Sequence, residues 1–278
     1  MDLSLLKQKL DTLQQKPNSG GQKTDYTKIF WRPTVGKQQI RIVPSAYNSK
    51  NPFTELKFYY GITNKVMISP LNFKEKDPIA LFAQKLREGE YNKENYVLAK
   101  KLDPKTRVFA PVIVRGEEDK GVRLWQFGKL VYEELLSLAV DEEIGDYTDV
   151  ATGRDLTVET VGPESTGTQY NKSSVRVRLK TTPLSTNASQ VETWLKEQPE
   201  SIKLFKRFTF DEMKSALEKW LSPEVEEEGA ISSEPAVEFD DEKPASKFSL
   251  DTSNVKATKA DKFDAMFDDK KEIDDLPF

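Results

Sequence analysis

The residues from Phe30 to Leu179 alternate between apolar and polar with a period of two, and this alternation most limits what the chain can fold into. Such a pattern is typical of half-buried β-strands. Clusters of Gly, Pro, Asn, Asp and Ser separate the alternating segments and predict turns. Few helical segments intervene, which favours a mainly β (α+β) antiparallel barrel or sandwich over a doubly wound parallel sheet. The predicted strands lie at 39–43, 55–60, 107–114, 122–127, 156–161 and 174–179.

Helices are predicted at three places in the same part of the chain. Asp77 followed by Pro78 has the pattern of an N-cap and a first helical residue. Residues 129–139 place apolar side chains at helical spacing. Thr209 and Glu212 have the spacing of a capping box, which predicts the start of a third helix.

The chain divides into three parts by composition. Residues 1–24 form an arm, in which leucines spaced three and four apart between 3 and 13 line one face of a short helix. A Pro, Gly and Ser linker at 17–21 separates that helix from the core, predicted over 25–221. Two interpretations of the leucine face stay open: docking on the chain's own core and docking on a neighbouring molecule.

The third part, residues 222–278, is strongly acidic. It holds 17 Asp and Glu residues against 7 Lys and Arg, whereas the rest of the chain holds 29 acidic and 35 basic residues. The tail is rich in charged residues, Ser and Pro and poor in large aliphatic residues, which predicts disorder. A basic body with an acidic tail favours a protein that binds a polyanion and keeps a peptide available for partners. A merely solubilising tail is the alternative.

The composition excludes several classes of chemistry. The chain contains no cysteine and no histidine, so disulfides, thiolate zinc sites and Ser-His-Asp catalysis are impossible. Carboxylate chemistry remains, but no motif supports it, and we expect no enzymatic activity, no cofactor and no bound metal. The sequence has no apolar run long enough to cross a membrane and no secretory signal, which predicts a location in the cytoplasm.

Cationic and aromatic residues share faces of the predicted strands. By alternation Arg107 shares a face with Phe109, and Arg123 shares one with Trp125. Single-stranded nucleic acid needs cations that follow phosphates and flat rings on which bases stack. Burial of these rings in the core is the alternative, and we favour burial for three phenylalanines. The expected core rings are Phe30, Phe58 and Phe127; the expected stacking rings are Tyr59, Tyr60, Tyr96, Phe109 and Trp125.

Several cations accompany these rings. Lys57 shares a strand face with Tyr59, and a short cationic run extends from Lys100 to Arg107. Arg41 interrupts an apolar strand, where two interpretations are open: a contact with a nucleic-acid backbone, or a half-buried partner for a carboxylate. The alternating Arg176, Arg178 and Lys180 fit a solvated strand face as well as they fit a nucleic-acid contact.

Three blocks carry a family resemblance: Trp31 with 36–45, residues 122–129 and residues 104–107. They resemble parts of the core of the T-even-type phage single-stranded-DNA-binding (helix-destabilising) proteins. Trp31 with 36–45 resembles the opening of that core, and 122–129 resembles a second stretch. Residues 104–107 resemble the short basic and threonine motif of the family. The resemblance covers roughly 25–220 in short blocks. It implies an OB-fold core that coats single-stranded DNA in replication, recombination and repair, in the cytoplasm of a bacterial host.

The resemblance also implies residue roles. By position, it implies that single-stranded DNA contacts Arg41, Lys101, Lys105, Arg107, Phe109, Arg123, Trp125 and Lys129. The cationic and aromatic pattern adds Lys57, Tyr59, Tyr60, Tyr96 and Lys100 to the expected DNA contacts. Cooperative self-association along DNA is expected to use Leu3, Leu6, Lys7, Lys9 and Leu10. The family's zinc subdomain would fall near 60–95, where this chain has no zinc ligand, and a small hydrophobic core is expected in its place.

The C-terminal tip has an acidic pair before a final Leu-Pro-Phe: Asp274, Asp275, Leu276, Pro277 and Phe278. It is similar to the tip of bacterial single-stranded-DNA-binding proteins, in which an acidic stretch before a final Pro-Phe docks replication and repair enzymes. An apolar pocket with basic surroundings on a partner would bind such a tip. Three other functions stay open: an OB-like protein-binding adaptor of the replication machinery, a strand-annealing factor and a magnesium-dependent nuclease.

Overall fold

A computed structural model describes residues 26–88 and 91–221 of the protein. The predicted N-terminal arm, the acidic tail and its tip lie outside these residues. Within them, no helix has the length and apolar character needed to cross a membrane.

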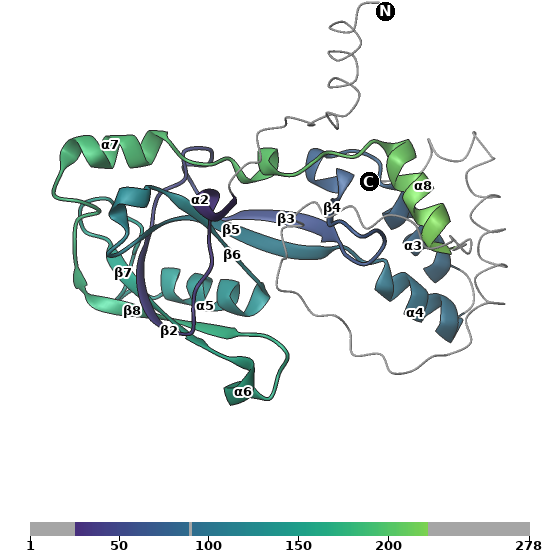
Figure 1. Ribbon diagram of the computed structural model, residues 1–278, viewed down its shortest axis with the longest axis horizontal. Helices are drawn as coiled ribbons and strands as arrows, with labels where there is room; N and C mark the ends of the chain where they lie inside the picture. Colours follow the sequence, from purple (N-terminus) through teal and green to yellow (C-terminus); the bar gives the residue numbers. More distant parts are fainter. Residues whose placement is uncertain (1–25, 89–90, 222–278) are drawn as a thin grey trace, which may run out of the picture.

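One eight-stranded sheet forms the framework of the fold (Figure 1). Its main path has the order β1-β6-β5-β2-β7-β8, in which β1 pairs with β6 in parallel and the other pairs are antiparallel. All six strands predicted from the alternation are present. The strands are β1 (Phe30–Trp31), β2 (Gly36–Ile42), β3 (Thr54–Tyr59), β4 (Met67–Ile68), β5 (Lys105–Val114), β6 (Arg123–Phe127), β7 (Arg154–Val161) and β8 (Lys172–Thr181).

The long strand β5 changes partner along one edge. Its first half pairs with β3, from Thr54 opposite Phe109 to Phe58 opposite Lys105, and its last residues pair with β2. Pro111 lies where β5 changes from β3 to β2, a position at which the missing N–H of proline is tolerated. The Pro111 carbonyl oxygen accepts a hydrogen bond from the Val43 N–H at 2.9 Å. The β3–β4 extension therefore diverges from the rest of the sheet.

The sheet does not close through strand pairing. Among the described residues β8 pairs with β7 and no other strand, and β1 occupies the free edge of β6. The mixed α+β class is confirmed, whereas a closed barrel is not.

Helices contribute more of the fold than the sequence pattern predicted. The three predicted helices are present, but α4 and α7 were missed, each capped by an asparagine side chain. The α-helices are α2 (Tyr26–Ile29), α3 (Pro78–Arg87), α4 (Lys93–Lys101), α5 (Lys129–Ala139), α6 (Pro163–Thr166), α7 (Ala188–Lys196) and α8 (Phe210–Leu221). Short 3-10 helices lie at η1 (Pro70–Phe73), η2 (Glu118–Lys120) and η3 (Ser201–Leu204).

The predicted capping signals form as expected. Asp77 Oδ1 accepts the N–H groups of Ile79 (3.0 Å) and Ala80 (3.2 Å) at the start of α3. At α8, the Glu212 N–H donates to Thr209 Oγ1 (3.2 Å) and the Thr209 N–H donates to Glu212 Oε2 (2.8 Å), which completes the capping box.

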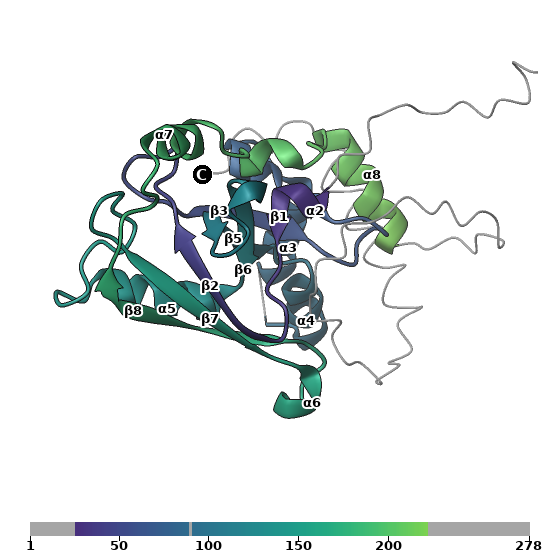
Figure 2. The ribbon, with the colours of Figure 1, turned by 60° about the vertical axis from the view of Figure 1, so that its left-hand side comes forward.

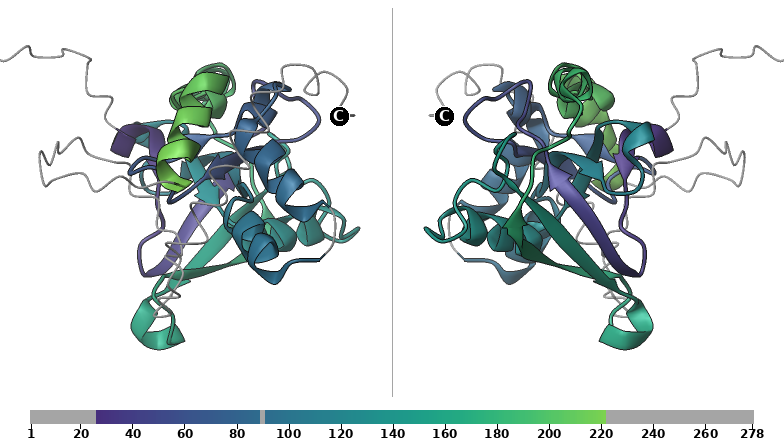
Figure 3. Two further views of the ribbon diagram at one scale, coloured as in Figure 1. Left: turned by 90° about the vertical axis from the view of Figure 1, so that its right-hand side faces the viewer. Right: turned by 90° about the vertical axis from the view of Figure 1, so that its left-hand side faces the viewer.

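The main core lies between the inner face of the sheet and α5. Inward residues of the strands, such as Ile40, Val112, Trp125 and Val158, pack there with Leu135 of α5. Figure 2 shows α5 beside β7 and β8. The helix α6 lies at the tip of the β7–β8 hairpin, away from this core (Figure 3).

A second core joins α3, α4 and α8 to the β3–β4 extension. It contains Ile79 and Phe82 of α3, Leu217 of α8, and Met67 and Tyr59 of the strands. Several of its residues fall within 60–95, so the expectation that a small hydrophobic core forms in that region is confirmed. We call this part the helical subdomain.

A long segment crosses the outer face of the sheet and joins α7 to α8 (Figure 1). We call residues 197–209 the strap. Its Phe205 packs against Phe58 and Phe109 with ring centroids 4.7 and 5.7 Å apart. The outer face of β3, β5 and β6 is therefore a third apolar cluster under the strap.

Candidate nucleic-acid interface

Two of the rings expected to stack on bases are buried. Trp125 is 1% exposed inside the main core. The centre of its ring lies 5.5 Å from that of Trp31 and 4.6 Å from that of Phe127. Phe109 is also 1% exposed, because the strap covers it. The prediction that these two rings stack on bases is therefore wrong, and both stabilise the fold. The three phenylalanines expected in the core, Phe30, Phe58 and Phe127, are buried as predicted.

Tyr59 is buried as well and has a structural role. Its hydroxyl donates to Asp77 Oδ2 at 2.9 Å, and the Ser69 hydroxyl donates to the same oxygen at 2.6 Å. Burial and the neighbouring Asp77 charge raise the pKa of Tyr59 well above its ordinary value. Its expected role in stacking is wrong, because the ring is 2% exposed. The hydroxyl instead links β3 to the start of α3.

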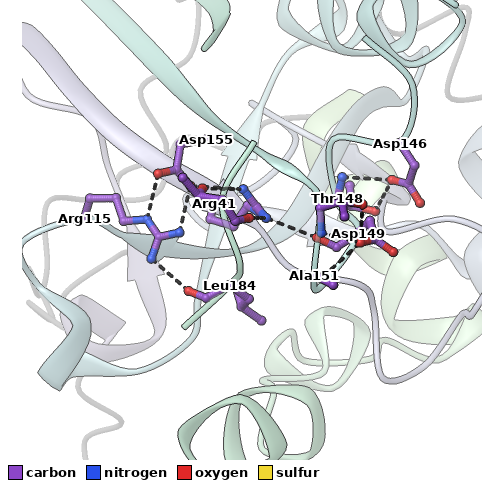
Figure 4. Close-up of polar contacts among 10 residues, drawn as sticks. Arg41, Arg115, Asp146, Thr148, Asp149, Ala151, Asp155 and Leu184 are labelled. Carbon is purple, nitrogen blue, oxygen red and sulfur yellow. Dashed lines mark hydrogen bonds and ion pairs between the residues drawn. The ribbon is translucent and has the colours of Figure 1, made fainter. Parts of the chain in front are cut away.

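Arg41 lies in a buried polar network on the outer face of β2 (Figure 4). Its guanidinium donates to Asp155 Oδ1 (3.2 Å), the Thr182 carbonyl (2.6 Å) and the Asp149 carbonyl (3.1 Å). Arg115 also donates to both oxygens of Asp155, at 2.8 and 3.1 Å. We call these residues the Arg41 network. The carboxylate-partner interpretation of Arg41 is confirmed, and the nucleic-acid contact is wrong.

Burial lowers the pKa of Arg41, and the charge of Asp155 opposes this effect. An arginine starts from so high a pKa that it stays protonated. Arg41 Nε is buried without a hydrogen-bond partner among the described residues. The chain at Gly153 lies against the network: a Cβ there would be 2.7 Å from Arg41 Nη2 and 2.3 Å from the Asp149 carbonyl oxygen. Only glycine tolerates this approach.

Arg123 is buried at the start of β6 and pairs with Glu117. The hydrogen bond from Arg123, followed by that from Lys120, lowers the pKa of Glu117. A compensated, buried arginine is a poor phosphate ligand, so the expected DNA contact of Arg123 is corrected to a structural one.

The remaining predicted residues include one compact cationic and aromatic cluster. Lys105 Nζ lies 5.9 Å and the Arg107 guanidinium carbon 5.7 Å from the centre of the Tyr60 ring. All three side chains are half-buried. We call Tyr60, Lys105 and Arg107 the Tyr60 cluster.

The strand register explains this cluster. Leu56 is opposite Arg107 and Phe58 is opposite Lys105, so these side chains share the outer face of the sheet. Tyr60 directly follows β3 and continues the same face, where it packs against the third apolar cluster. Arg107 Nη1 also lies 3.6 Å from where a Cβ of Gly128 would be, which places the cluster beside the start of α5.

Burial raises the pKa of Tyr60, while the positive charge of Arg107 lowers it. The net direction is upward, so the phenol stays neutral at physiological pH. A neutral ring beside two cations offers a stacking surface and charge for phosphates at one point.

The helix α4, together with Tyr91 just before it, carries a second exposed aromatic and cationic surface. Tyr96 is 48% exposed and its ring lies 6.2 Å from that of Tyr91, which is 80% exposed. Lys93, Lys100 and Lys101 are exposed on the same helix. Tyr91 was missed from the sequence because α4 was missed, although Asn92 offered an N-cap signal. We call these five residues the α4 surface.

Two predicted cations, Lys57 and Lys129, lie outside both groups. Lys57 is exposed on the opposite face of β3 from Phe58, and its backbone is held by the Asn72 side chain. Lys129 is exposed at the start of α5 and pairs with Glu133 at 3.3 Å. The residues expected to act in self-association and partner docking lie outside the described part of the chain.

The strap carries two cation–ring pairs that sequence reasoning missed. Lys206 Nζ lies 4.9 Å from the Phe208 ring centre, and the Arg207 guanidinium carbon lies 4.5 Å from that of Phe73. Both cations are also paired with glutamates, Glu212 and Glu75. Their charge is therefore largely compensated within the fold.

Comparisons with known proteins do not assign a family. No protein-family model matches the chain, and a search of curated proteins finds no match. Among residues 26–88 and 91–221, no group of three or more acidic side chains is arranged to hold a metal ion.

Proposed function

We propose that the protein binds single-stranded DNA without sequence preference and coats it during phage replication, recombination and repair. The observation that carries the proposal is the Tyr60 cluster, in which one half-buried ring has two cations 5.9 and 5.7 Å from its centre. The α4 surface supplies a second set of exposed rings and lysines in the adjacent helical subdomain.

The chemistry of these residues supports a sequence-independent mode. Stacking of one base on an aromatic ring is worth ~1–3 kcal/mol and is possible for every base. Lysine and arginine contribute by releasing counterions from the phosphates, which makes the affinity fall as salt rises. Neither contribution reads the edges of the bases.

The topology gives further support for an OB-type core. The path β2, β5, β6, α5, β7 and β8 follows the order of a five-stranded, partly open Greek-key barrel with a helix between its third and fourth strands. OB folds bind oligonucleotides on the face of the second and third strands and with the loops that follow the first and fourth. Tyr60 and α4 both belong to the long connection between β2 and β5, the first of those loops.

The ends of the chain complete the proposal. We propose that the arm at 1–24 supports self-association along DNA and that the tip Asp274–Phe278 recruits replication and recombination enzymes in the cytoplasm of a bacterial host. The tip offers an apolar side chain together with carboxylates, as in the docking of C-terminal peptides. Pull-down of replication enzymes by the full chain, and its loss when Phe278 is deleted, checks this part.

The main test is a titration of a fluorescein-labelled oligo-dT at two salt concentrations. The anisotropy of the label is the appropriate signal, because the protein's Trp31, Trp125 and Trp194 are buried and report poorly on stacking. We expect binding that weakens steeply with salt, and about tenfold weaker binding for Tyr60→Ala through the loss of one stacked base.

The matched control is Lys196→Ala, because Lys196 is an exposed cation of α7 that pairs with Glu192. Its affinity should equal that of the wild type. Absence of salt-sensitive binding to oligo-dT would overturn the proposal and favour the protein-binding adaptor. Pairing of complementary strands, or their cleavage in magnesium, would indicate the annealing factor or the nuclease.

A further inference from the structure

A groove lies between α7 and the turn that contains η2, and it has a volume of about 430 Å³. Val122 and Trp194, both buried, provide the apolar part of its lining. The rest of the lining is polar and comes from one side of α7 and from Glu118 and Asp119. Such a volume is within the range of clefts that hold ligands. We call it the α7 groove, and the residues proposed to contact DNA do not line it.

The walls of the α7 groove carry uncompensated negative charge. Asp119 of η2 and Glu197 at the end of α7 lie on different walls, and neither pairs with a Lys or Arg of the described residues. Their neighbours Lys120 and Lys196 pair with other glutamates. A complementary occupant therefore brings positive charge to two carboxylates beside an apolar surface.

The described part of the chain begins close to this groove. Phe30 of β1 is opposite Leu124 of β6, and α2, which starts at Tyr26, directly precedes β1 and contacts β6 (Figure 1). Because α2 rises only about 6 Å and paired strands lie about 5 Å apart, Tyr26 is within about 20 Å of Val122. The segment 17–25 can extend about 30 Å, so the residues that precede it can reach the groove.

The arm at 1–24 has the chemistry that the groove lacks. It holds Lys7, Lys9, Lys16 and Lys23 against two aspartates, and leucines lie on one face of its predicted helix. A lysine can lay its aliphatic stem along an apolar surface while its ammonium group meets a carboxylate. A short flexible tether gives an attached segment a millimolar local concentration, which favours the chain's own arm over that of another copy.

We propose that the arm docks in the α7 groove of its own chain, with lysines at Asp119 and Glu197 and an apolar side chain against Val122 and Trp194. Of the two interpretations of the leucine face, this is docking on the chain's own core. The inference goes beyond the proposed function, because it does not require DNA. Self-association through the arm would then require the arm to leave its own groove. The arm of a second copy is the competing occupant.

The experiment measures whether the arm lies at the groove in the full chain without DNA. The sequence has no cysteine, so nitroxide labels can be attached specifically at Ser4→Cys in the arm and Thr186→Cys just before α7. We expect pulsed electron paramagnetic resonance to give one narrow distance distribution. It should become broad in high salt and in the variant that combines Asp119→Lys with Glu197→Lys. The matched control Glu192→Lys changes an exposed residue of α7 outside the groove and should keep the narrow distribution.

A charge swap tests the contact directly. Replacing Lys7, Lys9 and Lys16 by glutamate should release the arm from the wild-type groove and restore the narrow distribution in the charge-reversed groove. A distribution that is broad in the wild type, or that does not respond to the groove charges, would overturn the proposal.

A mixture of singly labelled chains separates the two occupants. A narrow distribution between labels on different chains, absent from the doubly labelled chain diluted in unlabelled protein, would overturn docking on the same chain and assign the groove to a second copy's arm. Thermal unfolding of each variant verifies the fold. Because no measurement includes DNA, failure of this proposal is distinct from failure of the proposed function.

Discussion

Two arginines on the outer face of the same sheet differ in their burial and in their partners. Arg41 on β2 is enclosed by the Asp155 carboxylate and by backbone carbonyls, whereas Arg107 on β5 lies half-buried beside the Tyr60 ring. The difference comes from the groups that other segments place beside each strand: hydrogen-bond acceptors beside Arg41 and an aromatic ring beside Arg107. A strand arginine becomes structural where loops supply acceptors, and becomes a candidate ligand contact where it meets an aromatic ring near the surface.

The largest expected difference in stability is between the two single variants in which one of these arginines is replaced by alanine. Arg41→Ala removes a fully buried side chain, the donor to the Thr182 carbonyl and one of the two arginine partners of Asp155, so the free energy of unfolding should fall by about 3 kcal/mol. Arg107→Ala should change it by less than about 1 kcal/mol, but should reduce the salt slope of oligo-dT binding by about 0.7. Urea denaturation and anisotropy titrations measure the two quantities. Equal stability of the two variants would contradict the distinction between the sites.

A smaller effect is expected from the glycines beside the two arginines, because a side chain added at each would test how much space surrounds the arginine. A Cβ at Gly153 would collide with Arg41 Nη2 and two backbone carbonyls, so Gly153→Ala should destabilise the protein by about 2 kcal/mol. A Cβ at Gly128 would lie 3.6 Å from Arg107, an ordinary contact distance, so Gly128→Ala should cost only about 0.5 kcal/mol. Thermal unfolding of both variants checks this, and a cost at Gly128 as large as that at Gly153 would argue against a tightly enclosed Arg41.

The smallest expected effect concerns pH and a third arginine, Arg123. Its partner Glu117 has a pKa lowered from the ordinary 4.5, so the folded state favours the ionised carboxylate. The resulting stability is present above pH 4.5 and is lost as the pH falls through the lowered pKa. Since Glu117 is partly exposed, the contribution should be about 0.5 kcal/mol or less. Glu117→Gln should remove it, and an unchanged acid dependence of unfolding in that variant would refute the assignment.

Much of the secondary structure could be predicted because it follows from local rules. Alternation gave six strands, and side chains such as Asp77 and Thr209 marked helix starts that form with the expected hydrogen bonds. The helices α4 and α7 were missed because their apolar residues are few and their Asn caps are weak signals alone. The pairing of β1 with β6 could not be predicted, since a two-residue strand has no pattern.

The candidate site was predicted only in part, for a reason visible at two adjacent residues. Alternation correctly separated Tyr59 from Tyr60 by face, but it could not tell which face another element covers. The helical subdomain buries Tyr59, while Tyr60 stays half-exposed beside two cations. Phe109 illustrates the same limit, because the strap that buries it comes from residues far along the chain.

The sequence by itself determined the six longer strands, the impossibility of cysteine or histidine chemistry, and the recurrence of cations and rings on the strands. These properties depend on composition and on contacts between near neighbours. The tertiary structure alone decided which cations are neutralised and which rings are exposed. Both depend on segments distant in the chain: Asp155 and Thr182 enclose Arg41, the strap covers Phe109, and β3 and β5 together place Tyr60 beside Arg107.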